Sequence, residues 1–253
     1  MPRNPWLMPS RSGDSTALRL YCFPYAGGSA SVFHAWRAAL APDIEVVAVQ
    51  MPGRAERLFD PMPRRIEPLV AALAEAIAPP RGRPFAFFGH SLGGLVAFEL
   101  ARLLQRRGAA LPERVIVSGC DAPGHRKPDR AMHRLDDEAF VNVLRDYNGT
   151  PPEILANREL LRLLLPAVRA DFEISETYVP LSDLPLDRPL TVLVGTHDER
   201  HSDDAVDGWA RETHHACDVH WFDGDHFFIN PRRDAVLACV RRALLRSPQT
   251  LSA

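Results

Sequence analysis

The stretch FAFFGHSLGG, residues 85–94, decides the fold of this 253-residue chain. A short apolar run that suits a buried strand is followed at once by the pentapeptide GHSLG, and then by an apolar pattern of helical period. In a G-x-S-x-G pentapeptide the serine occupies a sharp strand-to-helix turn, where the glycines allow close approach of backbone and helix. The stretch therefore predicts that Ser91 presents its hydroxyl at the carboxyl edge of a sheet. The alternative is a tight turn whose serine only caps the helix.

Short apolar runs alternate with longer helical patterns on both sides of this stretch. Most of the runs are continuous rather than alternating, which suits strands that are covered on both faces. Alternation of strands and helices predicts the α/β class, a mostly parallel sheet with helices on both faces. The predicted strands are 18–23, 44–50, 85–88, 114–118, 190–194 and 219–222, and the predicted helices are about 30–40, 68–78, 92–107, 203–212 and 232–245.

The connection between the fourth and fifth predicted strands is much longer than one crossover helix requires. It runs from residue 119 to residue 189 and carries helical signals of its own. These are acidic residues at 136–138 that start a helix with Gly149 past its end, Asn157 as the cap of a second helix through Leu165, and a third apolar pattern over 166–178. We interpret residues 121–185, called the insertion below, as a helical lid within a single domain that spans 1–253. A packed layer without a functional role is the alternative.

Composition disfavours several classes of function. Thirty basic against 32 acidic residues give a formal net charge of −2, so there is no basic excess for nucleic-acid binding. Lys127 is the one lysine, and no lysine follows a glycine as a Walker phosphate loop requires. The four cysteines (Cys22, Cys120, Cys217 and Cys239) are scattered, which predicts small core residues rather than disulfides or a zinc site. No stretch suits a signal peptide or a membrane span, so we expect a cytoplasmic enzyme with no membrane partner.

Partners for Ser91 are expected at the ends of later strands. A serine hydroxyl is a poor nucleophile unless a histidine takes its proton and an acid holds that histidine in the right tautomer. With the nucleophile on such a turn, the acid and then the histidine follow along the chain. Predicted strand 190–194 leads into Asp198 and predicted strand 219–222 leads into His226. Ser91, Asp198 and His226 are thus the predicted nucleophile, acid and base. The competing acids are Glu199, Asp203 and Asp204.

The remaining histidines are interpreted as surface or hydrogen-bonded groups. A metal-binding pair at i, i+4 requires a helix, whereas His197 falls in a predicted loop. His90, inside the turn, is expected to pack or hydrogen-bond rather than to take part in proton transfer. We therefore predict no metal and no cofactor. The residues weighed as a metal cluster were His197, His201, Asp203, His214, His215 and His220.

Acyl transfer also requires two N–H donors for the oxyanion that develops during attack. One is the backbone N–H of Leu92, directly after the nucleophile. The other is expected in the loop FPYAGG, residues 23–28, where Ala26 is favoured over Tyr25. A loop of this kind also suits phosphate, but the chain has no G-x-G-x-x-G, which disfavours nucleotide binding.

Five motifs occur along the chain in the order FPYAGG (23–28), MPGR (51–54), GHSLGG (89–94), RAD (169–171) and GDHF (224–227). Together they resemble the type II thioesterases of polyketide and nonribosomal peptide biosynthesis. The resemblance covers about residues 18–245 and implies an α/β-hydrolase fold with a helical lid. It also implies hydrolysis of acyl thioesters on the phosphopantetheine arm of acyl or peptidyl carrier proteins, which removes stalled or misloaded groups during antibiotic biosynthesis. The family's nucleophile, acid and base fall on Ser91, Asp198 and His226.

The chain departs from the family pattern after the acid. A proline is usual about two residues after it, and Glu199-Arg200-His201 stands there instead. Two alternative functions stay open, a generic carboxylesterase and a non-catalytic binding protein of the hydrolase fold. A chain-terminating thioesterase or acyltransferase of this fold is a further reading. We expect a monomer whose partners are carrier proteins.

Overall fold

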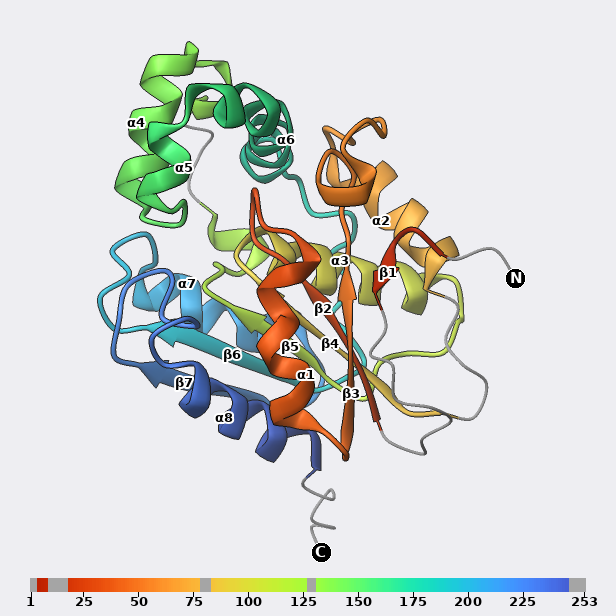
Figure 1. The fold of residues 1–253 in the computed structure, drawn as a ribbon. Coiled ribbons are helices and arrows are strands. Elements are labelled where there is room, and N and C mark those ends of the chain that lie inside the picture. The colour runs from red at the N-terminus through yellow and green to blue at the C-terminus, as the bar shows by residue number, and fades with distance from the viewer. Residues whose placement is uncertain (1–3, 9–17, 78–82, 127–130, 246–253) are drawn as a thin grey trace, which may run out of the picture.

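The computed structural model describes residues 4–8, 18–77, 83–126 and 131–245. Within these residues seven strands form one sheet, in the order β1-β3-β2-β4-β5-β6-β7 (Figure 1). The first strand pairs antiparallel with β3, and all other neighbours are parallel. The strands are β1 (Leu7–Met8), β2 (Leu18–Phe23), β3 (Ile44–Val49), β4 (Phe85–His90), β5 (Val115–Ser118), β6 (Leu190–Gly195) and β7 (Cys217–Phe222). The predicted mostly parallel sheet is confirmed.

Helices cover both faces of the sheet, as predicted. Successive strand residues point to opposite faces, so Phe88 packs with α1 (His34–Leu40) and α8 (Arg233–Leu245). Its neighbour Phe87 packs in the other cluster, with α2 (Ile66–Ala76) and α3 (Leu92–Arg106). All residues of β3, β4, β5 and β6 are buried, which is why these strands read as continuous apolar runs.

Short elements are where the sequence-based prediction is incomplete. The two residues of β1 are too few to show a period, and this strand was not predicted. The predicted helix 30–40 begins as a 3₁₀ turn, Ala30–Phe33, before α1. The predicted helix 203–212 divides into α7 (Asp203–Asp207) and a 3₁₀ segment, Gly208–Glu212.

The described residues of the insertion form three α-helices between β5 and β6, namely α4 (Asp137–Tyr147), α5 (Pro152–Ala156) and α6 (Arg158–Glu176), preceded by two short 3₁₀ turns. Asp136 caps α4 and Asn157 caps α6, each by accepting a hydrogen bond from a backbone N–H of the first turn. The expectation of separate helices before and after Pro166 is wrong, because α6 runs through this proline. The apolar side chains before and after Pro166 pack into one cluster, which keeps the two halves in line. The short α5 was not predicted.

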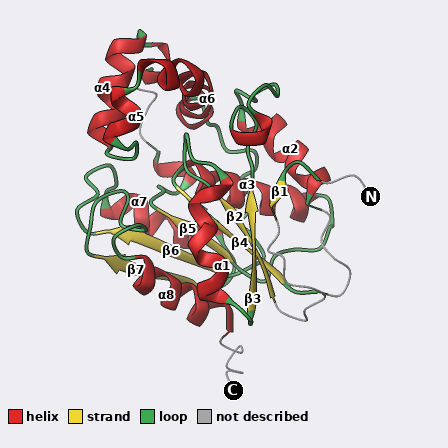
Figure 2. Cartoon of the chain, viewed as in Figure 1, coloured by secondary structure: helices red, strands yellow, loops and turns green. Residues whose placement is uncertain are grey.

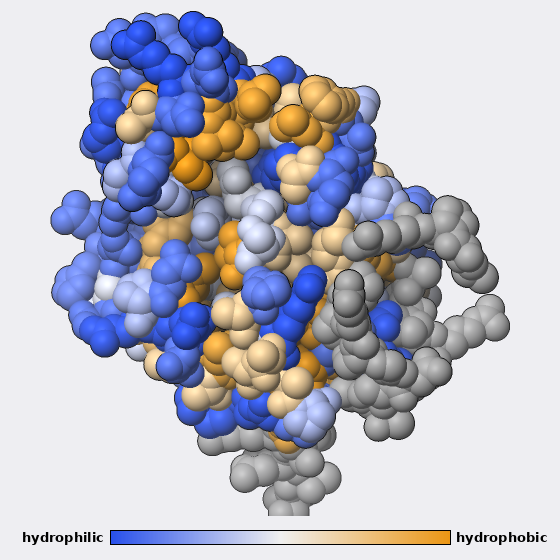
Figure 3. Space-filling view, viewed as in Figure 1, coloured by the Kyte–Doolittle hydropathy of each residue, from blue (hydrophilic) through white to orange (hydrophobic). Residues whose placement is uncertain are grey.

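The three helices lie together at the carboxyl edge of the sheet (Figure 2). They have a small core of their own, separate from the two clusters that cover the sheet. Hydrophobic side chains gather where the insertion faces the rest of the molecule, and hydrophilic ones occupy its outer side (Figure 3). Its buried core residues are Phe140, Leu144, Leu161, Leu165 and Phe172.

Two further sequence-based expectations concern the cysteines and the membrane. All four cysteines are free, three of them buried and Cys217 half-buried, as expected for small core residues. None of the helices in the described part of the chain combines the length and the apolar character needed to cross a membrane. Lys127 lies outside the described residues, and the single-domain organisation over 1–253 stays a prediction.

Candidate active site

Ser91 occupies the turn between β4 and α3 in a strained backbone conformation. Its φ of 54° and ψ of −119° lie where non-glycine residues are rare. A Cβ added at Gly89 would lie 1.9 Å from the Gly93 carbonyl oxygen, and one added at Gly93 would lie 2.1 Å from that of Phe23. Both positions therefore require glycine. The Ser91 backbone N–H donates to the Ser118 carbonyl at 2.7 Å, which ties the turn to β5.

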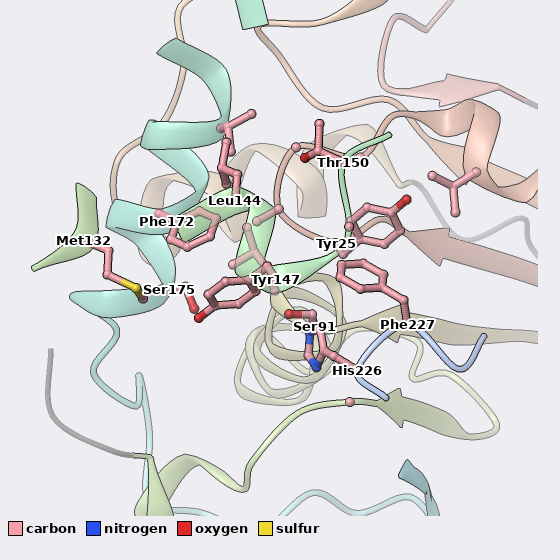
Figure 4. Close-up of a pocket in the computed structure, with 18 of the residues that line it drawn as sticks. Tyr25, Ser91, Met132, Leu144, Tyr147, Thr150, Phe172, Ser175, His226 and Phe227 are labelled. Carbon is pink, nitrogen blue, oxygen red and sulfur yellow. The ribbon is translucent and has the colours of Figure 1, made fainter. Parts of the chain in front are cut away.

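His226 and Asp198 meet at this edge of the sheet from the loops after β7 and β6. Nδ1 of His226 donates to Oδ2 of Asp198 at 2.5 Å, and both side chains are buried. Figure 4 shows the Ser91 side chain next to the His226 ring. Burial opposes the charge of Asp198, but contacts with His201 and His226 outweigh it and hold the pKa of this carboxyl well below its usual value. The other candidate acids (Glu199, Asp203 and Asp204) are exposed.

A second imidazole, His201, reaches the same carboxylate. Its Nε2 lies 3.0 Å from Oδ2 of Asp198, in the geometry of an ion pair rather than of an aligned hydrogen bond. Its Nδ1 donates to Oδ1 of Asp121 at 2.6 Å. Burial lowers the pKa of His201, but the two carboxylates outweigh burial and raise it to about 9. Sequence reasoning treated His201 as a surface or hydrogen-bonded group and missed its contact with Asp198.

Asp198, His201 and His226 also form a group of possible metal ligands, since one ligand atom from each lies within 4.8 Å of the others. The distances of 2.5 and 3.0 Å from Oδ2 to the two rings are those of hydrogen bonds and ion pairs between the groups themselves. Two ligand atoms that each lie about 2.0–2.1 Å from one tetrahedral zinc ion are about 3.3 Å apart, which is further than either of these distances. We therefore interpret the group as a charge network, and the absence of a metal stays a prediction.

The loop after β2 contributes backbone N–H groups to the same edge. The N–H of Gly27 donates to Oδ2 of Asp171 at 2.7 Å, and that of Gly28 donates to the Tyr25 carbonyl at 2.8 Å. These two donors are therefore engaged. Ala26, the predicted donor of this loop, lines the cavity together with Leu92, whose N–H in the first turn of α3 has no carbonyl partner within the helix.

A buried ion pair connects this loop to the insertion. Both terminal nitrogens of Arg54 donate to Asp171, at 2.7 and 2.9 Å, and one of them also donates to the Gly28 carbonyl at 3.0 Å. The two side chains are 6% and 4% exposed, so the pair lies in an environment where charges interact strongly. The motifs MPGR and RAD include these residues, but the sequence contains no signal that they touch each other.

His90 is fully buried below the turn, as its expected packing role requires. Its Nδ1 lies 2.9 Å from Oγ of Ser118. Burial, with the nearby His226 as a second cause, lowers the pKa of His90 well below its usual value. A neutral His90 can therefore support the turn without adding charge beside Ser91.

A cavity of about 370 Å³ lies between the sheet edge and the insertion. This volume is within the range of small-molecule binding sites. Ser91 and His226 line it from the sheet side, while Phe172 and Leu144 face it from the insertion (Figure 4). Among the apolar residues of the insertion, Leu144, Leu164, Val168 and Phe172 line the cavity, whereas Phe140 is in the insertion core.

Comparisons with known proteins identify relatives over most of the chain. The family model described as "Thioesterase domain" matches residues 18–244. The chain is 40% identical over 227 residues to the thioesterase PikA5 of Streptomyces venezuelae, covering 89% of this chain and 80% of that protein. It superposes on the type II thioesterase BorB of the borrelidin biosynthetic cluster with a TM-score of 0.86, at 36% identity, covering 93% and 96% of the two chains.

A third relative has a different kind of name. The linear gramicidin dehydrogenase LgrE of Brevibacillus parabrevis is 38% identical over 242 residues, covering 94% of this chain and 92% of that protein. The glycine fingerprint of dinucleotide binding, G-x-G-x-x-G, does not occur in the sequence of the present chain.

Proposed function

This chain belongs to the thioesterase family, and we propose that it hydrolyses acyl thioesters on the phosphopantetheine arm of acyl or peptidyl carrier proteins. Its role in polyketide or nonribosomal peptide synthesis is then to remove stalled or misloaded acyl groups. Relatives named as thioesterases of biosynthetic clusters support this role. The observation that carries the proposal is the placement of Ser91 beside the His226–Asp198 pair, on the wall of a cavity that the insertion closes with apolar side chains.

The proposed mechanism is that of a serine hydrolase. Oγ of Ser91 attacks the thioester carbonyl while Nε2 of His226 accepts the serine proton, and Asp198 holds the ring through Nδ1. The N–H groups of Ala26 and Leu92 stabilise the oxyanion. His226 then gives this proton to the departing pantetheine sulfur, which leaves as the thiol. A water molecule, deprotonated by His226, attacks the acyl-enzyme, and His226 returns the proton to Oγ of Ser91 as the acid is released.

The expected partners follow from this substrate. A carrier protein must bring its pantetheine arm to the cavity, while the chain has no basic excess for a nucleic acid. We also propose that the enzyme acts in the cytoplasm as a monomer, beside the synthase that it serves. Light scattering of the purified chain tests the oligomeric state.

A test of the nucleophile uses Ser91→Ala. We expect kcat on acyl-pantetheine and on acylated carrier protein to fall at least ~10³-fold, because the triad acts as a unit. Labelling by a fluorophosphonate probe should disappear in this variant. Ser31→Ala, which changes another serine of the same cavity, should keep both activity and labelling. Labelling that persists in Ser91→Ala would show that another residue is the nucleophile.

A comparison of substrates, combined with the probe labelling, separates the alternative functions. A matched pair of substrates with one acyl group, an acyl-pantetheine and the corresponding nitrophenyl ester, compares thioester with oxygen-ester hydrolysis. A kcat/KM that clearly favours the oxygen ester, with no turnover of acylated carrier protein, indicates a carboxylesterase. An intact chain that neither reacts with the probe nor hydrolyses either substrate indicates a binding protein.

A further inference from the structure

We propose that His201 is a positioning residue, a second imidazole that shares the Asp198 carboxylate with His226 and thereby sets the pH range in which His226 accepts the serine proton. The proposal rests on the proposed serine-hydrolase mechanism, but not on the identity of the acyl carrier. His201 acts on the reaction through its contact with Asp198 and through its charge near the His226 ring.

The contacts form a continuous chain of four side chains, Asp121–His201–Asp198–His226. Asp121 follows β5, His201 and Asp198 follow β6, and His226 follows β7, so the chain links the ends of three neighbouring strands. The joining distances are 2.6, 3.0 and 2.5 Å. No side chain among the four is more than 12% exposed. The four side chains are therefore held in fixed contact with one another and are largely shielded from water.

Charge alternates along this chain. His201 lies between two carboxylates, which favour its protonated form strongly enough to overcome burial. A protonated His201 offsets part of the negative charge that Asp198 presents to His226. The charged His201 ring also lies close to the His226 ring itself, with 5.9 Å between the two ring centres, so the two positive charges would repel each other. Both effects disfavour protonation of His226, so this base should stay neutral, and the enzyme active, to a lower pH than with Asp198 alone.

Other groups that face His226 and Asp198 do not reverse this effect. Nη1 of Arg200 lies 3.3 Å from Oδ1 of Asp198 and adds a second positive charge beside this carboxylate. His90, below the turn, is held neutral by burial. The Tyr147 ring of α4 lies perpendicular to the His226 ring in a T-shaped contact and brings no charge. Asp121 is the negative group at the far end, separated from His226 by His201 itself.

The decisive experiment is the pH profile of His201→Gln. Glutamine removes the charge and keeps an amide donor for Asp121 or Asp198. With kcat/KM measured between pH 5 and 9, we expect the acid limb of the variant to move to higher pH by about 1–2 units. This is the shift that a unit charge ~6 Å away produces at an effective dielectric of about 20–40, as suits groups enclosed within a protein. The rate on the high-pH plateau should stay within ~10-fold of the wild type.

A second variant should move the acid limb of the pH profile in the opposite direction. Asp121→Asn removes the carboxylate that offsets His201 while Asp198 still favours the protonated ring. The acid limb should therefore move to lower pH. His197→Gln is the matched control, because this histidine is exposed beside the acid and contacts Asp223 rather than the network. Its limb should coincide with that of the wild type.

Three outcomes overturn the proposal. A His201→Gln enzyme with a lower melting temperature but an unmoved limb shows a structural role only. Limbs that move in the same direction for His201→Gln and Asp121→Asn contradict the alternating charges. Loss of activity on dialysis against a chelator, restored by zinc, shows that Asp198, His201 and His226 are metal ligands instead. Profiles recorded with a nitrophenyl ester as well as acyl-pantetheine test His201 even if the carrier-bound substrate proves wrong.

Discussion

The sheet edge and the insertion build the two sides of one cavity by different physical means. At the sheet edge, Ser91, Asp198 and His226 lie within four residues of the ends of parallel strands, and the register of these strands fixes where each one ends. In the insertion, helix positions depend on a small side-chain core and on ion pairs such as Arg54–Asp171. Backbone hydrogen bonds therefore place the chemistry, and side-chain packing places the surface that meets the acyl group.

This difference predicts how substitutions on the two sides should behave. A change at the sheet edge should lower the rate for every acyl group alike, because the reacting atoms are the same in each. A change in the insertion should alter the ratio between acyl groups, unless the residue also contacts the sheet edge. Arg54 and Asp171 connect the insertion to the loop at the sheet edge. Substitutions of these two residues should therefore lower the rate and also alter the ratio between acyl groups.

The largest effect is expected for Asp198→Asn. Without the carboxylate, His226 loses the group that selects its tautomer and stabilises its charged form, so kcat should fall at least ~10³-fold for short and long acyl thioesters equally. Glu199→Gln, a change at the exposed neighbouring acid, should leave kcat nearly unchanged. Steady-state kinetics on both chain lengths measures this. Near-normal rates in Asp198→Asn would move the acid elsewhere, with Glu199 the first candidate.

An intermediate effect is expected for Asp171→Asn. Removal of the charge leaves Arg54 buried without its counter-ion, which destabilises proteins by about 3–5 kcal/mol. Because Asp171 also accepts from Gly27, the loop that carries Ala26 should shift and kcat should fall about 10-fold, with a small change in KM. Glu173→Gln, on the same helix, affects only exposed ion pairs with Arg64 and Arg65 and should cost less than about 1 kcal/mol.

Denaturant unfolding and kinetics, measured together, decide this case. Loss of stability with an unchanged kcat would show that the ion pair only anchors the insertion. Loss of both stability and kcat would show that Asp171 supports the sheet edge as well as the insertion.

The smallest effect on rate is expected for Phe172→Ala. Phe172 lines the cavity and packs edge-on against Phe140 and Tyr147. Its removal should change the ratio of kcat/KM for long over short acyl thioesters several-fold, with little effect on an acetyl group. Phe140→Ala is the matched control, because Phe140 is in the same core but does not line the cavity. It should lower the melting temperature and keep the ratio.

If both phenylalanine variants lose stability and neither changes the ratio, the insertion is a packing layer and not a selectivity element. If the ratio changes in Phe172→Ala alone, the insertion sets acyl preference.

The same contrast explains what the sequence predicts well. Local patterns predict six of the strands, because a parallel strand that is buried on both faces appears as a continuous apolar run. They also place Ser91, Asp198 and His226 near strand ends. The strained turn is equally local, because glycines on both sides of Ser91 are needed for close backbone approach.

Contacts between distant side chains are what the sequence does not contain. Nothing in the spacing of Arg54 and Asp171 indicates that they pair across 117 positions. The contact between Asp121 and His201 is hidden in the same way, since it depends on β5 and β6 being neighbours. The run of α6 through Pro166 is a tertiary effect too, because packing on the insertion core overrides a residue that normally ends a helix.

The Arg54–Asp171 pair makes α6 a lever with its pivot near one end. The helix is fastened to the loop of Gly27 and Gly28 at Asp171, while its start at Arg158, which follows closely on α5, lies about 20 Å further along its axis. A tilt of only ~15° about that pivot carries the far end through ~5 Å, enough to admit a chain as thin as pantetheine. The N–H groups beside the pivot hardly move during such a swing. A swing of this kind would admit the substrate without disturbing the oxyanion donors, although both involve the same helix.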